Sequence, residues 1–462
     1  MSMTGDTIAA ISTPLGEGSI GIVRISGEDS FRIASEIFRP KKNIDPSEMK
    51  PRTMYLGSIV DPGSGEVIDE VLLVKYKAPF TYTRENMVEI NCHGGFTVQR
   101  RILEVVLGRG ARVAEPGEFT KRAFLNGRID LSQAEAVIDI IRAKTDRALN
   151  VAVNQLKGGL SERIREVRQR ILRIIAHIEA NIDFPEDDIP EADPDTIRED
   201  IRGIRVELEE LLKKAQAGKI MREGLSTVIL GRPNVGKSSL LNSLLREKRA
   251  IVTDIPGTTR DIIEEYLNIN GIPVKIVDTA GIRETCDAVE KIGVERALES
   301  LKEAELVLLM LDASDELREE DRAIMELVKD KFVIVVLNKT DLPEKLSVDE
   351  VKSAFPGKPL IRVSALREKG IEELKEAIYR AVTEEIGPVD EGVIVTRARH
   401  SQAVKNAVEA LERAESALSS GIPMEMVAME VREAWERLGE ITGDTVREDV
   451  VNAIFENFCI GK

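Results

Sequence analysis

The sequence predicts a multidomain protein of the α/β and α classes, in which an α/β domain is inserted into a discontinuous helical domain that follows an N-terminal α+β domain. Its 462 residues suggest about three domains at roughly 150 residues each. Apolar strand runs alternate with helical patterns between residues 227 and 383, and charged helical patterns lie on both sides of this segment. Because the ends of a domain often lie close together, one interrupted helical domain is preferred, and two separate helical domains remain the alternative.

The N-terminal α+β domain is expected over residues 1–118, where short β-rich runs are separated by turns. The runs cover residues 19–25, 52–60 and 70–76. A helix with an apolar face is predicted directly after His93-Gly-Gly. Pro116-Gly117 then interrupts the pattern, and the character of the chain changes beyond it.

The helical domain is expected in two parts, residues 119–220 and residues 385–462. A capping box at Ser132 and Glu135 is predicted in the first part. Apolar residues then repeat at helical spacing, and arginines alternate with them at Arg163, Arg165, Arg168, Arg170 and Arg173. Solvation of the helix surface is the favoured explanation of these arginines, and an RNA-binding face is the alternative.

The inserted α/β domain is expected over residues 221–384. Continuous apolar runs at residues 227–230, 274–277, 306–311, 332–337 and 360–363 alternate with helical patterns. Such runs are typical of strands buried on both faces, so a mostly parallel sheet is predicted.

Composition excludes several classes of protein. The 65 basic and 81 acidic residues give a formal charge of −16, which argues against nonspecific coating of nucleic acid but leaves a local basic face open. Three separated cysteines, three histidines and 4% aromatic residues argue against a disulfide framework, a multi-histidine metal site and a base-stacking platform. Because no apolar run approaches the roughly 20 residues of a membrane-spanning helix, no membrane insertion and a cytoplasmic location are expected.

A phosphate-binding loop is predicted between residues 231 and 238, which read Gly-Arg-Pro-Asn-Val-Gly-Lys-Ser. This pattern follows a predicted strand and opens a predicted helix, which is the context that the motif requires. Backbone amides would surround phosphate oxygens, Lys237 would add a cation at the terminal phosphates, and Ser238 would ligate Mg²⁺.

Three further motifs follow in order and predict a GTP site. Asp278-Thr-Ala-Gly281 and Asn338-Lys-Thr-Asp341 each follow a predicted strand, and the carboxylate of Asp341 can accept two donors from guanine that adenine lacks. Thr259 offers a second hydroxyl to Mg²⁺. The residues expected to contact GTP are Asn234, Val235, Gly236, Lys237, Ser238, Ser239, Thr253, Asp254, Ile255, Pro256, Gly257, Thr258, Thr259, Asp278, Thr279, Ala280, Gly281, Asn338, Lys339, Thr340, Asp341, Ser364, Ala365 and Leu366.

Hydrolysis of GTP needs a positioned water and additional positive charge. The residue after Gly281 is Ile282, which cannot orient water. Arg283, Glu284 and Glu290 are the downstream candidates, and the residues by themselves do not rank these three.

The chain ends in Phe458-Cys-Ile-Gly-Lys462, and Gly-Glu-Phe-Thr-Lys-Arg-Ala-Phe-Leu-Asn occupies residues 117–126. With the opening Asp6-Thr-Ile-Ala-Ala and the inserted GTP-binding domain, the whole chain resembles the MnmE (TrmE) family of tRNA modification GTPases. The resemblance implies a homodimer formed through the N-terminal domain. It also implies a complex, a heterotetramer or larger, with a flavin-dependent partner called MnmG or GidA that carries FAD.

The implied function is the addition of a carboxymethylaminomethyl-type group to carbon 5 of the wobble uridine of certain tRNAs, with a one-carbon donor such as a 5-formyl or methylene tetrahydrofolate. Two rivals remain. One is a ribosome-assembly or signalling GTPase whose flanking domains bind RNA or protein, and the other is a folate-dependent one-carbon transferase in which the GTPase only regulates.

The resemblance also implies roles for individual residues. The folate-contacting positions fall at Arg24, Glu85, Arg128 and Lys462, and Arg128 stands where relatives carry lysine. K⁺ would be held by Asn234, Thr253, Ile255 and Thr258, and Glu290 would orient the attacking water through a second water. Lys237 would act in catalysis at the phosphates. For Cys459 both a direct chemical role and that of a small packed side chain stay open.

Overall fold

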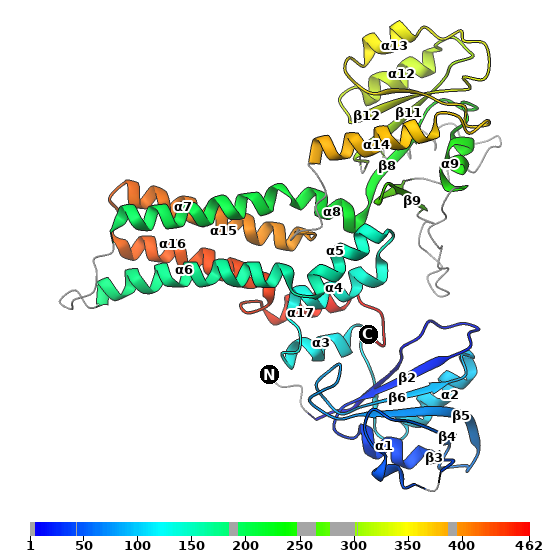
Figure 1. Cartoon of the computed structure of the whole chain (residues 1–462), viewed down its shortest axis with the longest axis vertical. Helices are drawn as coiled ribbons and strands as arrows, with labels where there is room; N and C mark the ends of the chain where they lie inside the picture. Colours follow the sequence, from blue (N-terminus) through cyan, green and yellow to red (C-terminus); the bar gives the residue numbers. More distant parts are fainter. Residues whose placement is uncertain are drawn as a thin grey trace. The chain divides into compact units, whose positions relative to one another are not determined.

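The computed structural model describes residues 5–42, 44–183, 193–246, 265–277, 301–302, 304–386 and 395–462, and its elements are labelled as in Figure 1. The chain divides into two compact units. The first contains residues up to 138 together with residues 439–462, and the second contains the described residues between 139 and 438. An N-terminal sheet, long helices and a second, mostly parallel sheet confirm the predicted fold class.

The first unit is built on a seven-stranded sheet with the order β3-β4-β5-β6-β2-β1-β7. All neighbouring strands are antiparallel except β1 and β7, which are parallel. The strands are β1 Ile8–Ile11, β2 Gly21–Ser26, β3 Phe38–Pro40, β4 Met54–Val60, β5 Val67–Tyr76, β6 Met87–Cys92 and β7 Arg112–Val113.

Helices α1 (Ser30–Ile37) and α2 (Phe96–Leu107) pack on this sheet, and a short 3-10 helix follows β3 at Pro46–Glu48. Ile33 and Ile102 of the helices meet Ile25, Leu73 and Ile90 of the strands in one buried core. The opposite face of the sheet is partly covered as well, because Ile8, Ala10 and Met87 pack there with Ala114 and Phe119 in a second, smaller core. The predicted helix after His93 is α2, as expected.

The remainder of the first unit is helical. It comprises α3 (Glu118–Leu125), the first part of α4 (Leu131–Arg142) and α17 (Glu448–Phe455). Leu131 and Ile138 pack against Phe455 and Phe458, so residues more than 300 positions apart in the chain share one core.

The capping box predicted at Ser132 and Glu135 is wrong, because the cap lies two residues earlier in the chain. α4 begins at Leu131, and its cap is formed by Asp130 and Gln133. Asp130 Oδ1 accepts from the Gln133 amide at 3.0 Å, and Gln133 Oε1 accepts from the Asp130 amide at 2.9 Å. Ser132 instead donates to Asp130 from inside the first turn, because its position is already helical.

The helical part of the second unit consists of long amphipathic helices. They are α5 Asp146–Leu156, α6 Gly159–Asp183, α7 Pro194–Lys213, α8 Ala215–Glu223, α15 Ala398–Ser419 and α16 Met424–Thr442. α6 buries Ile164, Val167, Ile171 and Ile178 at helical spacing, as the apolar repeat predicts.

Several of the α6 arginines are held within the second unit. Arg163 and Arg170 both pair with Glu207 of α7, at 2.9 Å and 2.7 Å. Arg168 is only 8% exposed, lies over the ring of Trp435 of α16 at 4.2 Å and donates to the Trp435 carbonyl at 3.2 Å. Arg163 and Arg170 stay partly exposed, as solvation of the helix surface predicts, whereas for the buried Arg168 that prediction is wrong because its side chain is packed against Trp435. The contacts of all three arginines favour a role within the fold over an RNA-binding face.

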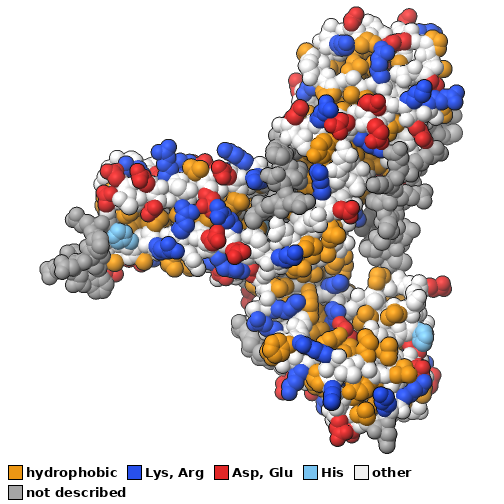
Figure 2. All heavy atoms as spheres, in the orientation of Figure 1, with side chains coloured by type: hydrophobic (Ala, Val, Ile, Leu, Met, Phe, Trp, Pro, Cys, Tyr) orange, Lys and Arg blue, Asp and Glu red, His pale blue; other side chains and the backbone are white. Residues whose placement is uncertain are grey.

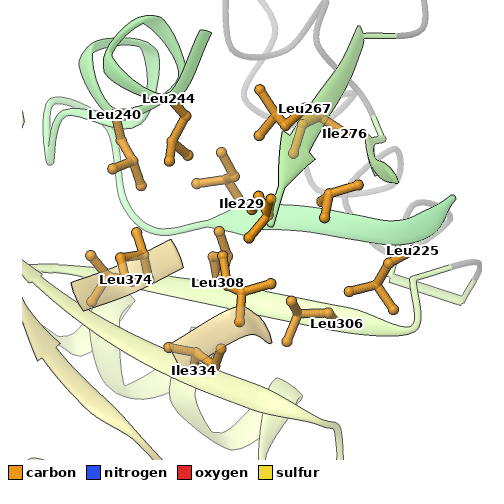
Figure 3. Packing of buried hydrophobic residues seen from close by; sticks show 14 of the residues in the cluster. Leu225, Ile229, Leu240, Leu244, Leu267, Ile276, Leu306, Leu308, Ile334 and Leu374 are labelled. Carbon is orange, nitrogen blue, oxygen red and sulfur yellow. The ribbon is translucent and has the colours of Figure 1, made fainter. Parts of the chain in front are cut away.

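The α/β part of the second unit has a six-stranded sheet with the order β13-β12-β11-β8-β10-β9. Its elements are β8 Leu225–Leu230, α9 Lys237–Arg246, β9 Glu265–Ile269, β10 Ile272–Ile276, β11 Leu306–Asp312, α12 Glu319–Val328, β12 Val333–Asn338, α13 Val348–Ala354, β13 Leu360–Arg362 and α14 Ile371–Ile386. Figure 3 shows Leu240 and Leu244 of α9 pointing towards Ile229 and Leu308 of the strands. This packing holds the carboxyl ends of the parallel strands beside one another.

β9 is a strand that the sequence analysis missed. It pairs with β10 in antiparallel fashion through a turn at Asn270 and Gly271, whose φ angles are 51° and 90°. The dipeptide Asn-Gly between two apolar runs is a strong hairpin signal and could have revealed the strand.

We predict that Arg168→Met destabilises the protein, because the long side chain and its contact with Trp435 are both buried. The free energy of unfolding in urea should fall by about 1–2 kcal/mol. Arg173→Met, at an exposed position of the same helix, should change it by less than about 0.5 kcal/mol. Equal effects of the two substitutions would contradict the assignment of Arg168 to the packing.

Candidate functional site

The loop between β8 and α9 has the backbone conformation of an anion-binding turn. Asn234 and Gly236 have φ angles of 62° and 103°, which turn successive amides towards one side. A Cβ atom on Gly236 would lie 2.3 Å from Nδ2 of Asn338, so the close approach of these two segments requires glycine at this position.

Lys237 opens α9 and is enclosed by the same loop. Its Nζ donates to the carbonyls of Gly231 and Arg232 at 2.7 Å and 3.0 Å. Burial lowers the pKa of Lys237 because its ammonium group has lost water. A phosphate group beside it would stabilise the charged form, so the loop and the lysine fit a polyphosphate ligand.

Asn338, at the end of β12, connects the phosphate loop to the loop after β13. Its Nδ2 donates to the carbonyl of Val235 at 2.7 Å, and its Oδ1 accepts from the amide of Ala365 at 3.0 Å. Both bonds are buried, so the loss of either would leave unpaired polar groups in the interior. The amide therefore holds three loops together at the carboxyl edge of the sheet.

The predicted base pocket is formed by the loop after β12 and the loop after β13. Ser364 donates to Oδ1 of Asp341 at 2.6 Å, and Thr340 donates to the carbonyl of Val363 at 2.9 Å. The Ser364 hydroxyl, followed by a backbone amide, lowers the pKa of Asp341. An ionised carboxylate that accepts hydrogen bonds is the group needed to receive two donors from guanine. Leu366 is 79% exposed next to it.

Asp312, at the end of β11, is a member of this site that the sequence analysis missed. Its Oδ2 accepts from Lys339 at 2.7 Å and lies 3.8 Å from Nη2 of Arg232. Burial raises the pKa of Asp312, but hydrogen bonds from Lys339 and Ser314 outweigh burial and leave it lowered. The carboxylate thus stays ionised between the phosphate loop and the base loop.

Arg232 itself is anchored by other carboxylates. Its Nη2 lies 2.8 Å from Asp315, and its Nε lies 3.2 Å from Asp321 of α12. Asp315 therefore contacts Arg232 as Asp312 does, but only Asp312 also contacts Lys339. The position of Asp312 directly after a buried strand was the available signal, because the carboxyl ends of parallel strands carry ligand-binding groups.

The remaining predicted nucleotide and ion contacts lie outside the described residues. They are Thr253, Asp254, Ile255, Pro256, Gly257, Thr258, Thr259, Asp278, Thr279, Ala280, Gly281 and Glu290. Asn234, Val235, Gly236, Lys237, Ser238 and Ser239 do belong to the described phosphate loop and α9.

Two of the predicted folate positions meet at one aromatic ring in the first unit. The guanidinium of Arg128 lies 4.6 Å from the ring centre of Tyr82, and that of Arg24 lies 5.8 Å from it. Arg24 also pairs with Glu89 at 2.8 Å. Tyr82 was not predicted, although its place two residues before Arg84 in an aromatic run could have drawn attention to it.

The C-terminal tetrapeptide lies against strands β1 and β2 of the same unit. Ser12 and Arg24 both donate to the carbonyl of Gly461, at 3.1 Å and 3.4 Å. The amide of Gly117 donates to the carbonyl of Cys459 at 3.2 Å. Gly461 has a φ of 89°, and a Cβ there would lie 2.3 Å from the carbonyl oxygen of Ile11. These contacts bring Gly461, the residue before Lys462, to Arg24, and Cys459 is exposed.

Glu85 is held by a buried arginine that the sequence analysis did not single out. Arg122, 4% exposed, lies 3.1 Å from Glu85, 2.9 Å from Glu118 and 2.7 Å from Asp6. Ser26 donates to the other oxygen of Glu85 at 2.7 Å. Burial raises the pKa of Glu118, but hydrogen bonds from Arg112 and the Glu115 amide, and then from Arg122, outweigh it. The contacts with Arg122 and Ser26 therefore fix the direction of the Glu85 carboxylate.

The described part of the chain contains neither a membrane-spanning helix nor a cluster of metal-binding side chains. None of its helices is long and apolar enough to cross a bilayer. No group of three or more His, Cys, Asp or Glu side chains within the described ranges could hold a metal ion.

Comparisons with known proteins match both parts of the chain to the same protein family. Residues 131–459 match the MnmE helical domain, and residues 7–128 match the N-terminus of the GTP-binding protein TrmE. A tRNA modification GTPase MnmE from Geobacillus thermodenitrificans is 53% identical over 460 residues, covering 99% of each chain. One from Bacillus subtilis is 52% identical over 460 residues, covering 99% of this chain and 100% of the relative.

Among solved structures, Aquifex aeolicus Era bound to GDP and aluminium fluoride shares 33% sequence identity. The match covers 40% of this chain and 65% of Era, with a TM-score of 0.27.

We predict that Asp312→Asn weakens GTP binding about five- to tenfold, because Lys339 loses a charged partner beside the base loop. Titration with a fluorescent GTP analogue measures the dissociation constant. GTP turnover at saturating nucleotide should change less than the dissociation constant does, because Asp312 lies outside the phosphate loop.

The control is Asp315→Asn, which removes a partner of Arg232 and leaves Lys339 untouched. This variant should bind GTP within about twofold of the unsubstituted protein. If both variants weakened binding equally, the contact between Asp312 and Lys339 would not be the cause.

Proposed function

The chain belongs to the MnmE family of tRNA modification GTPases, and from this membership we propose that its GTP hydrolysis drives modification of carbon 5 of the wobble uridine in certain tRNAs. It is a GTP hydrolase that acts in tRNA modification. The proposal adds the chemistry: a carboxymethylaminomethyl-type group is installed together with the flavin-dependent partner MnmG, and a tetrahydrofolate derivative supplies one carbon.

GTP binding is supported by the set of loops at the carboxyl edge of the second sheet. The left-handed turn at Asn234 and Gly236 together with Lys237 suits the phosphates. Asp341, held by Ser364, suits the two donors of guanine. Asn338 joins the two halves, so binding of one end of the nucleotide orders the loop that receives the other.

For hydrolysis, we assign Ser238 and Thr259 to Mg²⁺, and Asn234, Thr253, Ile255 and Thr258 to K⁺. These cations would neutralise charge that develops on the phosphate oxygens. Glu290 accepts a hydrogen bond from a water that positions the attacking water. The oxygen of the attacking water bonds to the terminal phosphorus while the bond to the bridging oxygen breaks, and GDP leaves with that electron pair. The proton released by the attacking water passes to an oxygen of the departing phosphate. Lys237 stabilises the leaving oxygens.

For folate, the first unit offers groups whose chemistry fits the ligand. The Glu85 carboxylate, held by Arg122 and Ser26, can accept two N–H donors of a pterin ring. Arg24, Arg128 and Lys462 are cations suited to its carboxylates. The folate derivative, when bound, would supply a carbon at the formyl or methylene oxidation level. Cys459 is exposed at the same end, and a direct chemical role for it belongs to the proposal.

Homodimer formation through the N-terminal domain is supported by its sheet. Leu56 and Leu72 are direct cross-strand partners and are 43% and 40% exposed, and Met54 beside them is 58% exposed. An exposed apolar face of this kind suits a protein partner. A cytoplasmic location, where tRNA and GTP occur together, is part of the proposal.

The observation that carries the proposal is the contact of the C-terminal tetrapeptide with Arg24. A ribosome-assembly or signalling GTPase with unrelated flanking domains has no need to bring its last residues to a set of cations and an oriented carboxylate. The contact instead joins the end of the chain to the predicted folate positions, and therefore favours one-carbon chemistry beside GTP hydrolysis.

We predict faster GTP hydrolysis in K⁺ than in Na⁺, by roughly tenfold or more, because a K⁺ ion would supply the positive charge that speeds GTP hydrolysis. Glu290→Ala should lower kcat by roughly 10²-fold or more while GTP affinity stays within about twofold. Glu284→Ala, which removes a carboxylate from the same segment, serves as the control and should retain most activity. Equal rates in the two salts would contradict the K⁺ assignment, and an active Glu290→Ala protein would contradict the assignment of Glu290.

The proposed function predicts that tRNA from cells lacking this protein carries unmodified wobble uridine. Nucleoside analysis of digested tRNA by mass spectrometry measures this directly. A gene copy encoding the native sequence should restore the modified nucleoside, and one encoding Lys237→Ala should not. Fully modified tRNA in the deletion strain would overturn the proposal.

A further inference from the structure

A hollow of about 560 Å³ on the first unit is lined by three arginines that the nucleotide site does not use. They are Arg52 before β4, Arg84 in the loop between β5 and β6, and Arg128 in the turn between α3 and α4. Tyr76, Phe80 and Tyr82 supply the apolar parts of the wall. On the face of this unit shown in Figure 2, Lys and Arg side chains lie beside exposed hydrophobic ones.

The three guanidinium groups have no carboxylate partner among the residues that the structure describes. Arg52 donates to the Phe80 carbonyl at 3.0 Å, Arg84 donates to the Asn126 carbonyl at 2.8 Å, and Arg128 lies over Tyr82. In a chain with 81 acidic and 65 basic residues, most arginines of this unit do find carboxylates, as Arg100, Arg101 and Arg112 do. Unpaired guanidinium groups that converge on one hollow indicate an anionic ligand.

Two of these arginines are also held in an unfavourable backbone conformation. Arg52 and Arg84 both have a φ of 61°, in the left-handed region that glycine and asparagine adopt more easily. A residue keeps this conformation only where contacts with the surrounding structure stabilise it, and such residues concentrate at ligand-binding positions. The side chains at these two positions are therefore placed at a cost in backbone energy.

The hollow continues from the residues assigned to folate. Arg128 belongs to both groups, and the guanidinium groups of Arg128 and Arg24 both lie over the ring of Tyr82, which also lines the hollow. A ligand that reaches Arg128 from Arg24 therefore enters the hollow that Arg84 and Arg52 also line. A volume of about 560 Å³ suits a part of a small ligand.

We propose that this hollow binds the additional glutamates of a polyglutamylated folate, with Arg52 and Arg84 pairing with the carboxylates beyond the first glutamate and the exposed ring of Phe80 packing against its carbon chain. The inference rests on the proposed folate site and names which form of the donor that site prefers. A folate with several glutamates presents one further carboxylate for each added residue. Guanidinium groups bind carboxylates through two parallel hydrogen bonds.

The test compares the mono- and triglutamate forms of 5-formyltetrahydrofolate by isothermal titration calorimetry on the full-length protein. The native chain should bind the triglutamate roughly tenfold more tightly than the monoglutamate. Arg84→Asn should abolish this preference and leave monoglutamate affinity within about twofold. Because asparagine tolerates the left-handed conformation, the variant should fold, and its thermal unfolding midpoint checks this. Arg84→Lys should keep part of the preference, since it retains the charge but not the paired donors.

Arg100→Gln is the matched control, because Arg100 is an exposed arginine of the same unit that pairs with Glu104 and does not line the hollow. This variant should keep the whole preference. Equal affinity of the native chain for the two folates, or an undiminished preference in Arg84→Asn, would overturn the inference and leave the folate site standing. Absence of any folate binding would overturn the folate site and this inference with it. Loss of tRNA affinity in Arg84→Asn with unchanged folate binding would assign the hollow to RNA instead.

Discussion

The nucleotide site depends on the side-chain amide of Asn338. This group is buried, donates to the phosphate loop at Val235 and accepts from the loop after β13 at Ala365. Gly236 must lack a side chain because Nδ2 of Asn338 already occupies the space that a Cβ would fill. One amide thereby fixes the distance between the groups that would hold phosphate and those that would hold the base. A nucleotide of the right length can bridge that distance, and its two ends are recognised together.

Around this amide, charged groups tie the same loops a second time. Asp312 lies between Lys339 of the base loop and Arg232 of the phosphate loop, while Asp315 and Asp321 hold Arg232 from the side of α12. In the first unit an analogous cluster, centred on Arg122, directs Glu85. The acidic excess of the chain is thus partly used to orient cations and carboxylates at sites. Acidic side chains are missing from the hollow of Arg52, Arg84 and Arg128, where none of the described lining residues carries a carboxylate. A protein of charge −16 is not expected to bind tRNA through electrostatic attraction alone. We therefore expect the partner to supply much of the positive surface that contacts the tRNA phosphates.

The sequence predicted those features that depend on neighbouring residues. Continuous apolar runs marked β8, β10, β11, β12 and β13 because strands buried on both faces need them. The phosphate loop was recognisable from its glycines and lysine. The contacts of Arg122 with Asp6, 116 positions away, and of Asp312 with Lys339, 27 positions away, were not predictable, because they arise only when segments distant in the chain meet in the folded structure. The helix cap at Asp130 was missed for a different reason, since Ser132 and Glu135 offered the same spacing two residues later. The C-terminal tetrapeptide was recognised as a signature, but its contact with Arg24 required the structure.

The central claim is that the carboxylate of Asp341 reads guanine at the carboxyl edge of the second sheet. The most direct measurement is the affinity of the native chain and of Asp341→Asn for GTP and for xanthosine triphosphate, whose base carries a carbonyl where guanine carries an amino group. The native chain should prefer GTP by roughly 10²-fold or more, and Asp341→Asn should prefer xanthosine triphosphate, because an amide can donate to that carbonyl. Retention of the GTP preference by Asp341→Asn would contradict the account.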